Sequence, residues 1–353
     1  MFLGHQLPYK KSKEDVDTIT LMKGREVTGS KEMETVVFGP VPSRRLGRSL
    51  GINNIPPKFC SYSCVYCQLG KTKDIKITRK PFYIAEEIFE QVKRKVNVAT
   101  SKNEVIDYLT FVADGEPTLD INLGKEISLS KQIGIPIAVI NNSSLIWQNG
   151  VKEDLLAADL VSFKVDILNE KLWRRINRPH KDLKLNTILD GINDFAGEFN
   201  GTIITETMLI NGIKYGDEFG KIVEFLKSLK RLDKAYVAIP TRPPAERFVS
   251  PAKEETMNRA FQVFAKGLGA DKVECLVGYE GNAFSFTGRV EEDLLGITSV
   301  HPMREEAVKE FLRKTDRSWY VVESLLREGK LVELEYEGSM YYMRKLQTIN
   351  ENK

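Results

Sequence analysis

Three cysteines lie close together in the stretch KFCSYSCVYCQLG, residues 58–70. They are Cys60, Cys64 and Cys67, and the remaining 345 positions outside their eight-residue window hold only one more cysteine, Cys275. Four cysteines in 353 residues, three of them too close together to staple a fold, do not form a disulfide framework. The spacing therefore predicts a metal centre held by thiolates.

The number of thiolates restricts the kind of metal centre. Structural zinc normally takes four protein ligands, and no second CxxC or HxxxH pair occurs in the chain, so His5 or His301 would have to complete a zinc site. A 4Fe-4S cube held by three thiolates instead leaves one iron open to a ligand from outside the protein. The sequence favours the cube, and an open iron indicates chemistry. Cys275 lies in a distant apolar run and is interpreted as a small buried hydrophobe.

The elements that must position these cysteines follow an alternating pattern. Apolar runs rich in Val and Ile predict strands at residues 49–53, 107–113, 135–141, 160–166, 201–210, 235–240 and 272–278. Amphipathic patterns between them predict helices at residues 85–96, 122–133, 151–158, 186–199, 216–232 and 251–268. The alternation predicts an α/β fold with a parallel sheet, either doubly wound or curled into a full or partial barrel. In each case the functional side chains belong at the carboxyl ends of the strands.

The two ends of the chain differ from this pattern. Residues 1–35 are polar without a clear period and predict an N-terminal arm, followed by a main domain at residues 36–290. Helical patterns at 302–316 and 317–330 and a hairpin pattern at 331–346 predict a winged-helix-like module at residues 291–353, with a packing or dimerisation cap as the alternative. From His301 to Lys353, ten Lys or Arg balance ten Asp or Glu, so this module lacks the basic surface of a nucleic-acid reader.

The composition sets the broad class of protein. Hydrophobic residues make up 42% of the chain, yet no apolar run approaches about 18 residues, the length that a membrane span needs. The start MFLGHQLPYKKSKEDVD also lacks the apolar segment of a signal peptide. We therefore expect a cytoplasmic protein without a membrane partner.

The spacing C-x3-C-x2-C, with Tyr66 directly before the last cysteine, resembles the radical S-adenosylmethionine (SAM) superfamily. The resemblance implies a partial (β/α)6 barrel, which agrees with the alternation of strands and helices. It also implies a 4Fe-4S cluster and SAM as cofactors. In that superfamily the open iron chelates the methionine moiety of SAM, and one electron cleaves the sulfonium to give a 5'-deoxyadenosyl radical. A one-electron reductant such as flavodoxin or ferredoxin is then a partner.

The resemblance extends beyond the cysteine motif. The lead-in FGPVPSRRLGRSLGINNIPPKFCSYSCVYCQLGKT and the tail LLGITSVHPMREE are similar to a family of uncharacterised iron-sulfur radical enzymes. Their nearer relatives include nitrogenase-cofactor and molybdenum-cofactor biosynthesis proteins. The likeness implies a fold and a cofactor but no settled substrate, because this barrel hosts many reactions.

Two turns after predicted strands are candidates for contact with SAM, as is Tyr66. The stretch DGEP at residues 114–117 is similar to the superfamily's GGEP element, with Asp114 in place of the first glycine. The likeness implies that Gly115 allows close backbone approach and that Glu116 accepts from the amino group of SAM. Asn142, after the next strand, stands where relatives carry a polar turn that reaches the ribose or the carboxylate. Ordinary turns are the alternative for both stretches.

Charged residues also occur inside two predicted strands. The two-residue period places Ser162, Lys164 and Asp166 on one face, and buried charge is costly unless it is paired or functional. Lys164 is the candidate for the carboxylate of SAM and Asp166 for its ribose, unless they pair with each other or with Glu206. The next predicted strand places Glu206 and Met208 on one face and Thr205, Thr207 and Leu209 on the other. The sequence does not decide which of the two faces looks inward.

The distribution of charge suggests the substrate class. The net charge is only +3, but residues 41–80 contain nine Lys or Arg against Asp74 alone, and KLWRRINRPHK at 171–181 contains five and no acid. Both stretches are interpreted either as solvated faces or as the border of one barrel mouth that attracts an anionic substrate. The candidate substrate residues are Arg44, Arg45, Arg48, Arg174, Arg175 and Arg178.

Three functions remain open at this point. The first is a radical enzyme that modifies an RNA nucleotide, tRNA above all, which would resemble the wyosine-forming branch of the superfamily. The second is a radical enzyme that acts on a small phosphorylated metabolite or on a protein, with the C-terminal module as a partner contact. The third is a non-catalytic iron-sulfur or zinc protein that binds nucleic acid.

Overall fold

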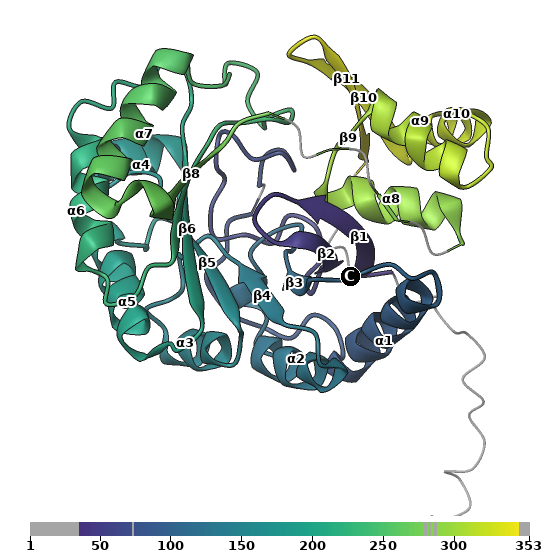
Figure 1. Cartoon of the computed structure of the whole chain (residues 1–353), viewed down its shortest axis with the longest axis horizontal. Helices are drawn as coiled ribbons and strands as arrows, with labels where there is room; N and C mark the ends of the chain where they lie inside the picture. Colours follow the sequence, from purple (N-terminus) through teal and green to yellow (C-terminus); the bar gives the residue numbers. More distant parts are fainter. Residues whose placement is uncertain (1–34, 73, 279–280, 282–283, 286–287, 346–353) are drawn as a thin grey trace, which may run out of the picture. The chain divides into compact units, whose positions relative to one another are not determined.

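The computed structural model describes residues 35–345 except for residues 73, 279–280, 282–283 and 286–287. The arm predicted at residues 1–35 lies outside the described residues apart from Thr35. Figure 1 shows the arrangement of helices and strands, coloured along the sequence.

One curled sheet forms the centre of the described part of the chain. Its strand order follows the sequence, with β1 antiparallel to β2 and every later neighbour pair parallel. The eight strands are β1 (Val37–Ser43), β2 (Gly47–Ile52), β3 (Tyr108–Phe111), β4 (Ile137–Ile140), β5 (Leu160–Lys164), β6 (Thr202–Met208), β7 (Lys234–Ala238) and β8 (Val273–Leu276). The seven strands predicted from sequence correspond to β2–β8, whereas β1 was not predicted.

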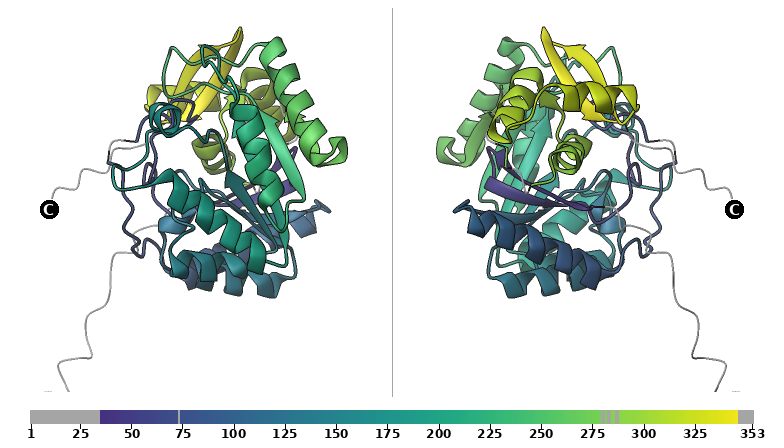
Figure 2. Two further views of the ribbon diagram at one scale, coloured as in Figure 1. Left: turned by 90° about the vertical axis from the view of Figure 1, so that its left-hand side faces the viewer. Right: turned by 90° about the vertical axis from the view of Figure 1, so that its right-hand side faces the viewer.

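Helices connect the parallel strands and cover the convex face of the sheet (Figures 1 and 2). They are α1 (Ala85–Ser101), α2 (Leu123–Ser130), α3 (Asn149–Leu156), α4 (Glu170–Ile176), α5 (Leu185–Glu198), α6 (Glu218–Ser228) and α7 (Glu254–Leu268). The main hydrophobic core lies between this helical layer and the sheet, and it contains Val161, Phe195, Ile222 and Phe264, all fully buried. The predicted partial barrel is confirmed, and its parallel part contains strands β2–β8.

The turn between β1 and β2 fills the inside of the curled sheet. Leu46 in this turn is 2% exposed and packs with concave-face residues of five strands. They are Ala138, Leu160, Ile204, Tyr236, Ala238 and Leu276. A half-barrel leaves its concave face open, so an apolar plug is needed where no ligand lies. The adjacent Arg44 and Arg45 are thereby carried into the barrel interior.

The C-terminal part contains α8 (Val290–Val300), β9 (Met303–Arg304), α9 (Glu305–Lys314), α10 (Tyr320–Arg327), β10 (Leu331–Tyr336) and β11 (Ser339–Arg344). The two predicted helices and the hairpin are confirmed, and β9 adds a third strand beside β11. A second apolar core joins these helices to Phe38 and Val41 of β1. The boundary at residues 290 and 291 and the winged-helix comparison stay predictions.

None of the described helices is both long and apolar enough to cross a membrane.

The plug in the barrel makes a prediction for stability. Leu46→Ala removes apolar contacts from a site with little room to collapse, so the free energy of unfolding should fall by about 2–4 kcal/mol. Val105→Ala is the control, because Val105 is 63% exposed and its loss should cost less than about 0.5 kcal/mol. Urea denaturation measures both. Equal effects of the two substitutions would contradict the claim that Leu46 stabilises the fold by packing inside the curled sheet.

Candidate active site

The cysteines lie on a loop that neighbouring segments hold in place. The loop follows β2, and its first residues pair with the DGEP turn after β3: the Lys58 N–H donates to the Asp114 carbonyl at 2.9 Å, and the Glu116 N–H donates to the Phe59 carbonyl at 2.9 Å. A Cβ on Gly115 would stand 1.8 Å from the Phe59 carbonyl oxygen. Glycine is therefore required at 115, because any side chain would push the two segments apart.

The middle of the loop is held by the end of α4 and by the segment after it. The Val65 N–H donates to the Ile176 carbonyl at 2.9 Å, and the Ser63 N–H donates to the Asn177 carbonyl at 3.1 Å. The His180 N–H donates to the Ser61 carbonyl at 2.9 Å. The basic stretch RRINRPHK thus contacts the cysteine loop directly.

All three cysteines line one cavity of about 300 Å³ inside the curled sheet. They are unbonded thiols, and burial raises the pKa of Cys60 and raises that of Cys64 to about 12. Side-chain amides lie next to two of the sulfurs: Asn142 Nδ2 is 3.5 Å from Cys60 Sγ, and Asn177 Nδ2 is 3.6 Å from Cys64 Sγ. Such donors stabilise a thiolate once a metal replaces its proton.

The donor set fits a cluster better than a single ion. Across the described ranges, no three His, Cys, Asp or Glu residues are grouped closely enough to hold one metal ion. The ring nitrogens of His301 lie 2.9 and 3.0 Å from the Arg242 guanidinium, so His301 does not complete a zinc site, and His5 lies outside the described residues. In a 4Fe-4S cube each of the three thiolates binds a different iron. Cysteines that line one cavity without meeting at a single point can therefore hold a cube.

Glu116 is buried beside the cysteines and links the two candidate SAM-binding turns. Its Oε1 accepts from the Thr118 hydroxyl at 2.5 Å, and its Oε2 accepts from the Asn142 N–H at 2.7 Å. Burial outweighs these hydrogen bonds and raises the pKa of Glu116 to about 7. Gly115, Glu116 and Asn142 all line the cavity, as predicted from their positions after β3 and β4.

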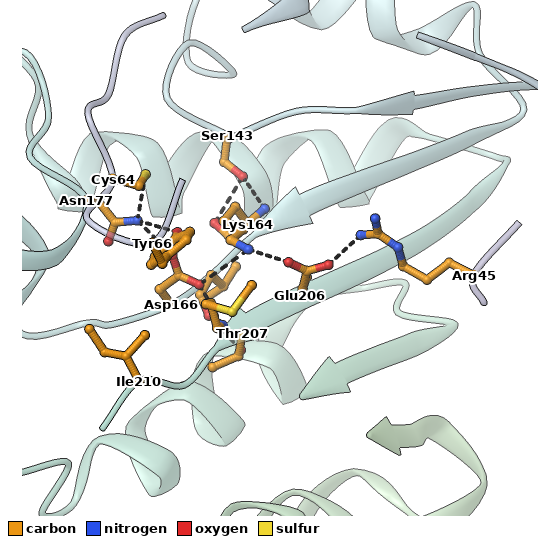
Figure 3. A network of polar contacts seen from close by, with 12 residues as sticks. Arg45, Cys64, Tyr66, Ser143, Lys164, Asp166, Asn177, Glu206, Thr207 and Ile210 are labelled. Carbon is orange, nitrogen blue, oxygen red and sulfur yellow. Dashed lines mark hydrogen bonds and ion pairs between the residues drawn. The ribbon is translucent and has the colours of Figure 1, made fainter. Parts of the chain in front are cut away.

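Strands β5 and β6 contribute a row of paired charges to the cavity (Figure 3). Lys164 and Arg45 both bind the Glu206 carboxylate, Arg45 at 2.5 Å. Burial opposes the charge on Glu206, but these two cations prevail and lower its pKa to about 2. Of the two faces of β6 left open by the sequence, the one with Glu206 and Met208 looks inward.

Asp166 does not lie where the sequence analysis expected it. It was placed on one inward face with Ser162 and Lys164, but β5 ends at Lys164, and Asp166 lies outside the cavity lining. Its Oδ2 accepts from the Tyr66 hydroxyl and from Asn177 Nδ2 (Figure 3). Its Oδ1 accepts from the Met208 N–H at 2.8 Å. Both oxygens are thus used inside the protein. In this structure Asp166 holds Tyr66 and Asn177 in place, and its contact with the ribose of SAM stays a prediction.

The six candidate arginines do not form one surface. Arg44 and Arg45 line the cavity, whereas Arg48 binds Glu104 at 3.3 Å and the Ser285 hydroxyl at 2.5 Å, away from the cavity lining. Arg174 and Arg175 are exposed in the last turn of α4, and Arg178 binds Glu246, which also binds Lys71. Counting charges along residues 41–80 overestimated the free positive charge, because acids distant in sequence neutralise much of it.

Several cavity residues were not predicted from sequence. Lys58, Gln68 and Arg242 line the cavity with the cysteines, and Gln68 accepts from Arg242 at 3.0 Å. Arg242 follows the carboxyl end of β7, so the rule that function lies after each strand could have identified it. Lys58 and Gln68 flank the cysteine motif, but their side-chain directions depend on the fold of the loop.

The buried Glu116 makes a prediction about pH. Its pKa rises from 4.5 when solvated to about 7 in the fold, so its protonated form stabilises the fold below pH 4.5 and this stability is lost as the pH rises through 7. The free energy of unfolding of the metal-free protein should therefore fall relative to Glu116→Gln by roughly 3 kcal/mol between these pH values, at about 1.4 kcal/mol per unit. Urea denaturation at several pH values tests this. A constant difference between the two proteins would contradict it.

Comparisons with known proteins identify the relatives of this chain. Residues 54–226 match the Radical SAM superfamily model. A UPF0026 protein of Methanocaldococcus jannaschii is 52% identical over 319 residues, which cover 90% of this chain and 98% of the relative. A UPF0026 protein of Helicobacter pylori is 33% identical over 68% of this chain and 76% of its own length. Among solved structures, a radical SAM methyltransferase from Sphaerobacter thermophilus matches with a TM-score of 0.49 and 16% identity, over 67% of this chain and 69% of that one.

The cofactors follow from the superfamily. The cavity fits them, because the three cysteines and several charged residues line the same space. The third hypothesis, a non-catalytic metal protein, is thereby wrong. The chain belongs to the UPF0026 family of the radical SAM superfamily, and it is an enzyme that uses a 4Fe-4S cluster and SAM for reductive cleavage chemistry.

Proposed function

We propose that Cys60, Cys64 and Cys67 hold the cluster and that the enzyme removes a hydrogen atom from an anionic substrate bound in the same cavity. The supporting observation is that one cavity contains all three cysteines together with cationic side chains from different parts of the chain. These are Arg44, Arg45, Lys58, Lys164 and Arg242. A cavity lined by several cations favours a substrate that carries negative charge.

We assign the cavity residues around the cluster and SAM as follows from their positions. When bound, the cluster and SAM supply the 5'-deoxyadenosyl radical. Gly115, Glu116, Asn142 and Lys164 contact SAM in this proposal, because each of them lines the cavity after or near the end of a parallel strand. Tyr66 also lines it, and its hydroxyl is held by Asp166. A flavodoxin or ferredoxin supplies the electron.

We further propose that the substrate is a nucleotide of RNA, tRNA above all. Arg174 and Arg175 are exposed in the last turn of α4, and the segment that follows pairs with the cysteine loop. Cations there can bind phosphates beside the active site while one nucleotide enters the cavity, as enzymes that act on bases do.

A second candidate is a small phosphorylated metabolite. Arg44 and Arg45 lie inside the cavity, where a small anion reaches them more readily than an RNA backbone does. Three of the candidate arginines pair with acids, which leaves fewer cations to follow a nucleic acid: Arg48 with Glu104, Arg174 with Glu170 and Arg178 with Glu246. A protein substrate is a further form of this candidate, with the C-terminal module as its contact.

The ligand assignment predicts the metal content of four variants. Anaerobic reconstitution should give about four irons per chain. Alanine at Cys60, Cys64 or Cys67 should abolish the cluster, because only three thiolates bind the four irons and the loss of one leaves two. Cys275→Ala should retain all the iron, since Cys275 lies on β8 outside the cavity lining. Iron and sulfide analysis with absorption near 400 nm measures this. Loss of the cluster in Cys275→Ala would overturn the three-cysteine assignment.

The RNA proposal predicts a steep dependence of tRNA binding on salt. Each neutralised phosphate adds about 0.7–0.9 to the slope of log affinity against log salt, so Arg174→Gln with Arg175→Gln should lower the slope by about one to two. The matched control is Lys230→Gln with Arg231→Gln, two exposed cations near Gly201 before β6. Filter binding at several salt concentrations measures the slopes. A shallow dependence of tRNA binding on salt that neither double substitution changes would favour the phosphorylated metabolite as the substrate.

A further inference from the structure

Lys58 has an unusual conformation at the start of the cysteine loop. Its φ is +71°, in the left-handed region that favours glycine, while its N–H is fixed to the Asp114 carbonyl at 2.9 Å. A lysine in this region costs free energy that the surrounding structure must offset. The loop therefore holds Lys58 in a backbone conformation that determines where its side chain goes.

The Lys58 side chain ends inside the protein. Lys58 lines the cavity with the cysteines. Its Nζ is shielded from solvent and has no hydrogen-bond partner among the residues that the structure describes. Nζ lies 3.5 Å from the position that a Cβ on Gly70 would take, which places it at the far end of the cysteine loop from its own Cα. The side chain thus spans the loop from Lys58, two residues before Cys60, to Gly70, three residues after Cys67.

The groups around the ammonium are anionic or become so. Cys60, Cys67 and Asp114 line the same cavity as Lys58. A buried ammonium without hydrogen bonds is costly, and an anion bound in the cavity removes that cost. Three thiolates around a 4Fe-4S core provide this anion, and one-electron reduction makes it more negative.

We propose that Lys58 is the counter-cation of the cluster and favours its reduced state. This rests on the proposed function, since it requires that the three cysteines hold the cluster. The net charge near an iron-sulfur cluster is one of the factors that set its reduction potential. A fixed cation in a poorly solvated cavity acts more strongly than one in water, because little solvent screens it.

Asp114 opposes Lys58 from the same cavity wall. Asp114 is 1% exposed and lines the cavity, and it stands where the superfamily element GGEP has its first glycine. Its carboxylate therefore adds a negative charge near the cluster, and Lys58 balances it. Lys58 and Asp114 thus form a charge couple that sets the ease of reduction in this chain.

The test is an EPR-monitored redox titration of the anaerobically reconstituted enzyme without SAM. Lys58→Met should lower the equilibrium constant for one-electron reduction at least tenfold, which is about 59 mV toward negative potential. Asp114→Asn should shift the potential in the opposite direction, and Lys58→Arg should stay within threefold of the wild type. The control is Lys80→Met, because Lys80 is exposed and its ammonium lies over the Phe59 ring, 4.5 Å from the centroid.

The outcomes separate this proposal from simpler accounts. A cluster with wild-type potential in Lys58→Met overturns it, and so does an equal shift in Lys80→Met. If Lys58→Met takes up no iron, the Lys58→Arg variant decides. Full iron content and a wild-type potential in Lys58→Arg support the charge-based role of Lys58. Loss of iron in both variants shows a packing role and overturns the proposal. A wild-type protein that binds no cluster at all refutes the proposed function instead.

Discussion

The active site depends on how a loop without regular secondary structure is held in place. The three cysteines lie between the end of β2 at Ile52 and the start of α1 at Ala85, and no helix or strand fixes their backbone in the described part of this segment. Ordering such a segment costs about 1–2 kcal/mol per residue in conformational entropy. Hydrogen bonds from the turn after β3, the segment after α4 and Glu246 offset that cost. The sheet therefore positions the cysteines indirectly, through the segments that follow its strands.

Charged groups inside the cavity are likewise paired with groups from other segments of the chain. Glu206 accepts from Lys164 and Arg45, which come from β5 and from the turn between β1 and β2. The same turn inserts Leu46 into the barrel, so one short segment both closes the apolar interior and supplies a cation to the site. Glu116 is held by N–H and hydroxyl donors, and their hydrogen bonds do not offset the burial that raises its pKa.

Local patterns allowed the parallel strands and most helices to be predicted, because the period of apolar residues differs between strand and helix. Strand β1 was missed because its sequence VFGPVPS contains a glycine and two prolines, which are rare within strands. Helix α4 was missed because it has only seven residues and was interpreted as a basic patch.

The composition of the candidate site was predictable in part. The cysteines, Gly115, Glu116, Asn142 and Lys164 line the cavity as expected from motif and strand end. Asp166 was misplaced because the end of β5 could not be set to within two residues. The ion pair of Arg48 with Glu104 joins positions 56 residues apart, and no local pattern reveals such a contact.

The central claim is that the three-cysteine cavity holds a 4Fe-4S cluster whose remaining iron is open to SAM. The most direct measurement is electron-nuclear double resonance on the reduced enzyme, mixed with SAM that carries nitrogen-15 in its amino group. Coordination at the open iron predicts a nitrogen-15 hyperfine coupling that appears with SAM and is absent with unlabelled SAM. A reduced cluster that shows no such coupling, although SAM is bound, would contradict the account.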